Sequence, residues 1–106
     1  MPTFHLPNLA SKEIIPGFHG RMIHTDRMTL AYWKVEEGAR LPEHHHPHEQ
    51  VTQVIEGSFR MTVGSESRVL EPGDVWVIPS DVPHSGEALS NCQLMDVFQP
   101  AREAYR

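Results

Sequence analysis

Four histidines and a glutamine lie within seven residues near the middle of the chain, in the run His44-His45-His46-Pro47-His48-Glu49-Gln50. In an extended strand, residues two apart point to the same face, so such a strand would bring two imidazoles and an amide oxygen together. Such a group predicts a divalent transition metal held by nitrogen and oxygen ligands. The plainer interpretation is a solvated, histidine-rich loop. The residues expected to share the face are His44, His46, Gln50, Thr52 and Val54.

A second motif begins with the turn Pro72-Gly73, continues through a short β-rich run and ends on His84. His84 is the fourth candidate ligand, beside His44, His46 and Gln50. Imidazole and amide oxygen suit nickel, zinc, iron, manganese and copper, so the sequence does not identify the ion. Gln50 has an alternative role, a hydrogen bond that orients a ligating histidine, with Glu49 or no residue as the fourth ligand.

The neutral amide of Gln50 affects the charge of the expected site. Three neutral imidazoles and an amide leave the double positive charge of the ion uncompensated, so the site should attract a carboxylate or an enolate. Two other histidines are not assigned to the metal. His45 faces away by strand alternation and His48 follows Pro47, so both are interpreted as structural or surface residues.

Three residues near the end of the chain form a second candidate group. Asp96 and Phe98 share a strand face, and if Leu94 lies on it too, Asp96 is a carboxylate directed into an apolar interior. Burial tends to raise the pKa of such a group, which suits general acid or base catalysis, and a nearby cation opposes that rise. Arg102, beyond Pro100, is placed to fold over the mouth and bind a carboxylate in bidentate fashion. The alternative is an ordinary surface ion pair between Asp96 and Arg102.

Short strands at regular intervals must position these residues, since the sequence has almost no helical periodicity. Turns are expected at Thr25-Asp26-Arg27, Glu56-Gly57, Gly64-Ser65 and Pro72-Gly73. The pattern predicts an all-β fold in a single domain, a closed or double-sheet antiparallel barrel. Trp33 and Trp76 are assigned to packing rather than to ligand stacking. The expected strands are two within Arg21 to Val35, the second of them Met28 to Val35, then Val51 to Ile55, Phe59 to Val63, Ser67 to Leu70, Val75 to Ile78, His84 to Ala88 and Gln93 to Phe98.

The chain has 106 residues, the size of one domain. Residues 1–20 are rich in proline and glycine and predict an N-terminal arm with a short edge strand around Glu13 to Ile15, followed by a barrel domain over residues 21–106. The formal charge of -5 argues against nucleic acid or an anionic membrane as a partner. Cys92, the single cysteine, is expected to be a small strand residue. No secretory pattern or membrane-length apolar run is present, so a cytoplasmic protein is expected.

The two motifs together resemble the signatures of the cupin family, which implies a small antiparallel double-sheet jelly-roll barrel. They read Gly38-x5-His44-x-His46-x3-Gln50-x6-Gly57 and Gly73-x5-Pro79-x4-His84. Gln50 stands where many cupins carry Glu, which affects the metal chemistry. Asp81 and Ala88 stand where the second motif often has Gly and Asn, which affects turn geometry. The short spacing between Gly57 and Gly73 is similar to that of compact microbial single-domain cupins.

A narrower resemblance is to the KdgF family, small cupins of pectin and alginate breakdown. It is carried by His-x-His-Pro-His-Glu-Gln, Pro-Gly-Asp, Pro-His and the ending Asp-Val-Phe-x-Pro-x-Arg-Glu. The resemblance implies that the protein converts unsaturated monouronates, released by polysaccharide lyases, to open-chain 5-keto-4-deoxyuronate. It also implies that the metal is held by His44, His46, Gln50 and His84, while Asp96, Phe98 and Arg102 face a small anionic sugar.

Other functions stay open, because a fold does not fix a function. One alternative is another cupin enzyme, a dioxygenase or a lyase acting on dimethylsulfoniopropionate; such lyases typically use active-site tyrosines, and this chain has only Tyr32 and Tyr105. Another alternative is a non-catalytic sugar-binding or regulatory module. The exposed strands of a barrel and the arm favour a homodimer in each case.

Overall fold

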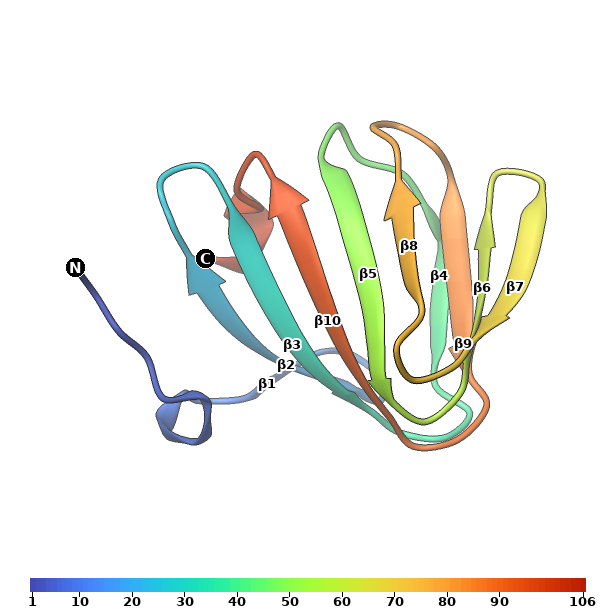
Figure 1. Cartoon of the computed structure of the whole chain (residues 1–106), viewed down its shortest axis with the longest axis horizontal. Coiled ribbons are helices and arrows are strands. Elements are labelled where there is room, and N and C mark those ends of the chain that lie inside the picture. Colours follow the sequence, from blue (N-terminus) through green and yellow to red (C-terminus); the bar gives the residue numbers. More distant parts are fainter.

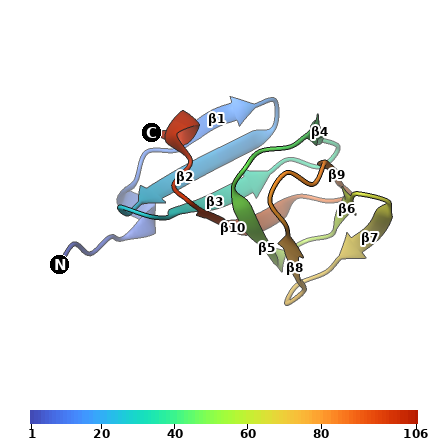
Figure 2. The same ribbon diagram turned by 90° about the horizontal axis from the view of Figure 1, so that it is seen from above.

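The computed structural model describes all residues from 1 to 106, and it consists of two antiparallel β-sheets (Figure 1). The larger sheet has the strand order β1-β2-β3-β10-β5-β8, and the smaller sheet has the order β4-β9-β6-β7. Figure 2 shows the two sheets as the walls of an open barrel. The elements, in chain order, are η1 (Leu6–Asn8), β1 (Lys12–Ile15), β2 (Phe18–His24), β3 (Thr29–Val35), β4 (Arg40–His44), β5 (Glu49–Glu56), β6 (Phe59–Val63), β7 (Glu66–Leu70), β8 (Val75–Ile78), β9 (His84–Ala88), β10 (Cys92–Gln99) and η2 (Glu103–Tyr105).

The expected all-β, double-sheet fold is confirmed, and the expected strands lie close to the observed ones. Alternation along the strands explains the core. On β10, for example, Leu94, Asp96 and Phe98 are buried while the residues between them are half-buried, so one face of the sheet turns inward. Phe59 of the smaller sheet packs edge-on against Phe18 of the larger sheet, with ring centroids 6.3 Å apart. Phe59 is 1% exposed, and truncation to Ala would cost about 3–5 kcal/mol.

The N-terminal residues divide between an arm and the larger sheet. Residues 12–20, which the sequence assigned to the arm, include β1 and the start of β2, and these two strands pair as a hairpin at the sheet edge. The earlier residues carry η1 and are tied to the sheet by the Arg21 side chain, whose Nε–H donates to the Leu9 carbonyl at 3.0 Å. None of the helices is long and apolar enough to span a membrane.

Two turns of the motifs have left-handed backbone conformations. Gly57 has φ +83°, and a Cβ atom there would approach the Asn91 carbonyl oxygen to 2.2 Å, so a side chain is excluded. Asp81 also has a positive φ of 63°, which Asp tolerates better than most residues. The Asp81 backbone N–H donates to the His46 carbonyl at 2.8 Å. The turn of the second motif therefore fixes the histidine loop of the first.

Candidate metal centre

Three of the predicted ligands, all histidines, converge from two strands and a loop. His44 is the last residue of β4 and His84 the first of β9, and the two are direct neighbours in the smaller sheet. His46 lies on the loop that crosses to the larger sheet, where Gln50 is on the inner face of β5. The expectation that these residues share one extended strand was wrong, because the chain changes sheets between His44 and Glu49. The side chains meet across the barrel instead of along a strand.

The orientation of each imidazole is set by a backbone carbonyl two residues away. Nδ1 of His44 lies 2.9 Å from the Pro42 carbonyl, and Nδ1 of His84 lies 2.9 Å from the Val82 carbonyl. Nδ1 of His46 likewise lies 3.1 Å from the His48 carbonyl. A carbonyl only accepts, so Nδ1 carries the proton in each ring and Nε2 of the neutral ring keeps a free lone pair.

Two of these lone pairs, on His84 and His46, face no hydrogen-bond donor inside the protein. Nε2 of His84 is buried and makes no hydrogen bond. Nε2 of His46 lies 3.1 Å from Oε1 of Gln50, so two acceptors face each other. One ligand atom from each of the three histidines falls within 4.8 Å of the others. A cation resolves both problems, so the donor set fits a divalent transition metal held by neutral ligands.

Burial keeps the cluster in the uncharged form that a metal requires. Burial lowers the pKa of His46 to about 4, with the positive charge of Arg102 and neighbouring His84 acting in the same direction. Burial likewise lowers the pKa of His84. Neutral imidazole is the ligating form, so these two candidate ligands do not need to lose a proton near neutral pH.

Asp96 lies inside the barrel, 8% exposed, as its strand alternation predicted. Its Oδ1 accepts a 2.6 Å hydrogen bond from the Thr52 hydroxyl, and its Oδ2 accepts one of 2.9 Å from Trp33 Nε1–H. Burial raises the pKa of Asp96 to about 6, although these donors and Arg102 act in the opposite direction. The Thr52 hydroxyl also accepts a 2.9 Å bond from the Gln50 amide, so a continuous chain joins the carboxylate to the candidate ligand.

Arg102 lines the same cavity without forming an ion pair to Asp96, so the alternative of a surface pair between them was wrong. Its guanidinium carbon lies 4.9 Å from the Phe98 ring centroid and 4.3 Å from that of Tyr105. Nη1 is buried with no hydrogen-bond partner. A buried, unpartnered N–H of a permanent cation is a site for an anion.

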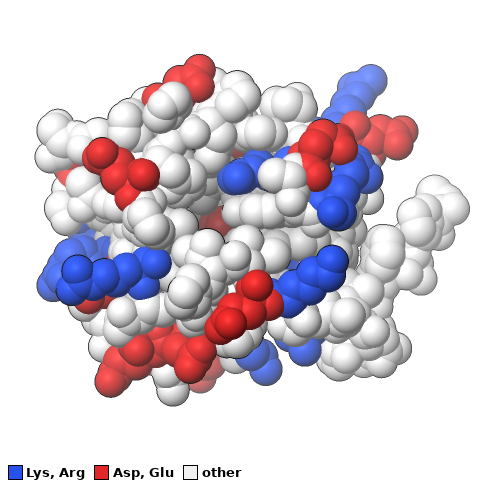
Figure 3. Space-filling view, turned by 180° about the vertical axis from the view of Figure 1, so that it is seen from behind, with Lys and Arg blue, Asp and Glu red and all other residues white.

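The cavity between the sheets has a volume of about 320 Å³, and its wall includes both candidate metal ligands and the candidate substrate-binding residues near the end of the chain. The space-filling view from behind shows a recess near the middle of the molecule, surrounded mostly by uncharged residues (Figure 3). Aliphatic and aromatic side chains form the rest of the wall. The polar or charged residues that line the cavity are His44, Gln50, Thr52, Asp96, Arg102 and Tyr105.

The other residues considered from the sequence are either exposed or support the site from outside the cluster. The His45 side chain is 66% exposed, 3.9 Å from Asp81, and Glu49 is exposed. His48 is half-buried, with its ring 5.3 Å from that of His46, and its carbonyl orients His46. Trp33 packs as expected, yet it also donates to Asp96.

Sequence reasoning did not assign Tyr105 or Thr52 to the site. Tyr105 lies only three residues beyond Arg102, and that spacing was the signal that could have found it. Thr52 was expected on the correct face, and its hydroxyl was the remaining clue to a hydrogen bond with a buried carboxylate.

Comparison with known proteins identifies the family of the chain and proteins with a similar fold. The cupin domain family matches residues 31–98. Pectin degradation protein KdgF of Dickeya dadantii (strain 3937) is 32% identical over 62 residues, which are 58% of this chain and 56% of that protein. The match therefore spans little more than half the length of that relative.

Two solved structures agree over nearly the whole fold. KdgF from Halomonas sp. has a TM-score of 0.94 and 28% identity, covering 100% of this chain and 99% of the other. An RmlC-like cupin from Shewanella frigidimarina NCIMB 400 has a TM-score of 0.90 and 29% identity, covering 94% and 91%. This chain belongs to the cupin family, as a single-domain cupin that resembles KdgF.

Proposed function

We propose that this protein is a metal-dependent enzyme that opens the ring of unsaturated monouronates and yields 5-keto-4-deoxyuronate. The observation that carries the proposal is one cavity of about 320 Å³ whose wall includes His44 of the histidine cluster, the carboxyl group of Asp96 and the guanidinium of Arg102, which has an unpartnered N–H. The similarity to two KdgF proteins supports the substrate class. His44, His46, His84 and Gln50 would hold the metal.

The reaction requires only proton movement. In an unsaturated uronate the ring oxygen belongs to both a hemiacetal and an enol ether. Loss of the anomeric hydroxyl proton forms the aldehyde and breaks the bond from the anomeric carbon to the ring oxygen, whose electrons stay with an enolate. A proton then adds to carbon, the double bond is lost and a ketone remains. When bound, the metal supplies Lewis-acid stabilisation of developing negative charge on oxygen.

The residues of the chain have distinct roles in this proposal. Asp96 accepts the anomeric hydroxyl proton at a carboxylate oxygen and returns one to carbon. A pKa raised to about 6 makes both directions accessible near neutral pH. Arg102 binds the substrate carboxylate through its free Nη1–H, while Phe98 holds the guanidinium from one side and excludes water.

The test is a turnover assay with unsaturated galacturonate and its alginate-derived counterpart. Metal-loaded protein should accelerate loss of the conjugated double-bond absorbance above a no-enzyme control, without oxygen consumption. Asp96→Asn should keep fold and metal but lose rate. Failure of the loaded wild type to accelerate either sugar would defeat the proposal, and oxygen consumption would indicate a dioxygenase.

A lyase acting on dimethylsulfoniopropionate is the second candidate, and one observation favours it. Tyr105, one of only two tyrosines, lines the cavity. Release of dimethyl sulfide from that compound, lost in Tyr105→Phe, would support the lyase. The absence of dimethyl sulfide together with uronate turnover would exclude it.

A homodimer is also proposed, through the outer face of the larger sheet. Strand register aligns an aliphatic side chain from each of five neighbouring strands into one row, and Val77 in it is 53% exposed. Val77→Lys should give a monomer in sedimentation analysis, whereas Val69→Lys, on the smaller sheet, should not. An unchanged dimer in Val77→Lys would contradict the proposed face. The row consists of Ile23, Leu30, Val97, Val51 and Val77.

A further inference from the structure

The segment after β10 brings two side chains to the cavity although it has little regular structure of its own. It runs from Ala101 to Arg106, contains η2, and carries Arg102 and Tyr105. The segment makes only two backbone hydrogen bonds within itself, from the N–H groups of Tyr105 and Arg106. Something else must therefore fix the guanidinium at its place between the rings of Phe98 and Tyr105.

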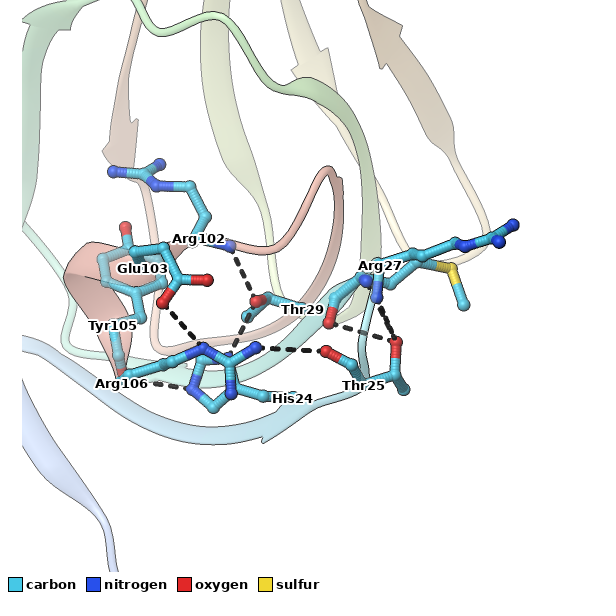
Figure 4. Close-up of polar contacts among 9 residues, drawn as sticks. His24, Thr25, Arg27, Thr29, Arg102, Glu103, Tyr105 and Arg106 are labelled. Atoms are coloured by element: carbon cyan, nitrogen blue, oxygen red, sulfur yellow. Dashed lines mark hydrogen bonds and ion pairs between the residues drawn. The ribbon is translucent and has the colours of Figure 1, made fainter.

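A circuit of hydrogen bonds to the turn between β2 and β3 supplies that support (Figure 4). The backbone N–H of Arg102 donates to Oγ1 of Thr29 at 2.8 Å. Oγ1 of Thr29 lies 2.8 Å from Nδ1 of His24. Nε2 of His24 lies 3.2 Å from the backbone carbonyl of Tyr105. The circuit starts at one cavity residue of the segment and ends at the other.

The direction of every proton in this circuit follows from the groups at its ends. The Tyr105 carbonyl only accepts, so His24 carries a proton on Nε2. Nδ1 of the neutral ring is then an acceptor, and the Thr29 hydroxyl donates to it. The Thr29 oxygen keeps a lone pair for the Arg102 N–H. With this tautomer of His24, each donor in the circuit has one acceptor.

Burial gives the circuit its strength. Thr29 is 0% exposed, so no water competes for its hydroxyl. A second, exposed link lies beside it: Arg106 donates from Nη2 to the Thr25 carbonyl at 3.1 Å and forms an ion pair with Glu103 at 2.9 Å. The exposed link adds little by itself, because surface ion pairs contribute weakly. The buried circuit is the part that holds the segment.

We propose that His24 and Thr29 are positioning residues for Arg102. By fixing the backbone on both sides of η2, they hold the guanidinium where its free Nη1–H meets the carboxylate of an anionic substrate. The ligand in this inference rests on the proposed function, but the circuit itself can be tested without any substrate. Neither residue lines the cavity, so both act through the segment.

The experiment compares Thr29→Val, which removes the hydroxyl at nearly constant volume, with Thr29→Ser, which keeps it. Thr62→Val is the control for the same side-chain change outside the circuit, because Thr62 donates a 3.2 Å bond to Ser67 in the other sheet. Hydrogen exchange at the Arg102 amide should accelerate about fivefold in Thr29→Val, the worth of one hydrogen bond, and stay near the wild-type rate in the other two variants. His24→Ala, at a half-buried position, should show the same acceleration. This variant replaces Thr29→Val in the test if Thr29→Val fails to fold.

Kinetics with unsaturated galacturonate separate positioning from general destabilisation. Thr29→Val and His24→Ala should raise KM about fivefold with kcat nearly unchanged, and Thr29→Ser should restore the wild-type KM. In an Arg102→Ala background, neither change should raise KM further, since the residue they position is already gone. An undiminished KM effect in that background would overturn the inference, as would unaltered Arg102 exchange in both variants. A wild type without turnover would defeat the proposed function, whereas the exchange result would still decide the circuit.

Discussion

Asp96→Asn is expected to stabilise the metal-free protein at pH 8 and to abolish the activity of the metal-loaded protein. Burial raises the pKa of this carboxyl from 3.8 to about 6. Since one pKa unit corresponds to about 1.4 kcal/mol, ionised Asp96 costs the folded state up to about 3 kcal/mol. Asn has nearly the same shape and no charge, so the variant avoids that cost.

The sign of the pH dependence follows from the direction of this shift. Because folding raises the pKa, the protonated carboxyl is favoured in the folded state. Its contribution to the free energy of unfolding is fully present below about pH 4 and is lost as the pH rises through about 6. The stability difference between Asp96→Asn and wild type should therefore be small at pH 4 and reach up to about 3 kcal/mol at pH 8.

Urea unfolding followed by tryptophan fluorescence, with chelator present, measures this difference. The pKa values of His46 and His84 are also shifted, but both proteins contain them, so their effect cancels in the comparison. Asp26→Asn, at an exposed turn, is the control and should change little. A gain of equal size at pH 4 and pH 8 would show that packing and not charge is responsible. No gain at pH 8 would refute the buried-charge argument.

Three further changes test the site. Gln50→Glu should bind metal more tightly and uronate more weakly, because the added carboxylate compensates the charge of the ion. Calorimetric titrations measure both affinities, and a rise in both would contradict the charge argument. Alanine at any one of the three clustered histidines should remove most of the metal while circular dichroism stays native; full metal content in all three variants would place the ion elsewhere. Trp33→Phe removes a donor to the Asp96 carboxylate and should move the acid limb of kcat/KM about one pH unit higher, whereas Trp76→Phe should leave it in place. An unchanged limb in Trp33→Phe would mean that this hydrogen bond does not set the pKa of Asp96.

The strands and turns could be predicted because their signals are local. Alternation on β10 placed Asp96 and Phe98 on the inner face, and the glycine at position 57 marked a turn that only glycine fits. The clustering of His44 with His46 was also expected, but for a wrong reason. Pro47 is a local signal for the break between β4 and β5, but which sheet each strand joins depends on long-range pairing.

Contacts between distant residues could not be read from the sequence. The bond from Trp33 to Asp96 spans 63 positions, and the bond from Thr29 to Arg102 spans 73. The imidazole orientations depend on carbonyls close in sequence, yet they require backbone angles that residue types alone do not specify. The fold class and the residues of the histidine cluster were therefore accessible from the sequence, whereas the hydrogen-bond network was not.

The Thr52 hydroxyl, which lies between Gln50 and Asp96, has only one proton to give. In the proposed centre the Gln50 oxygen faces the ion, so its NH₂ group donates to Thr52 and the Thr52 proton must point at Asp96. That arrangement favours the carboxylate over the acid. Metal binding and proton release at Asp96 are then thermodynamically linked. Because linkage is reciprocal, protonation of Asp96 lowers the affinity for the metal by the same factor by which the bound metal lowers the affinity of Asp96 for its proton. Part of the pH dependence of metal affinity would therefore originate at a residue that never touches the ion.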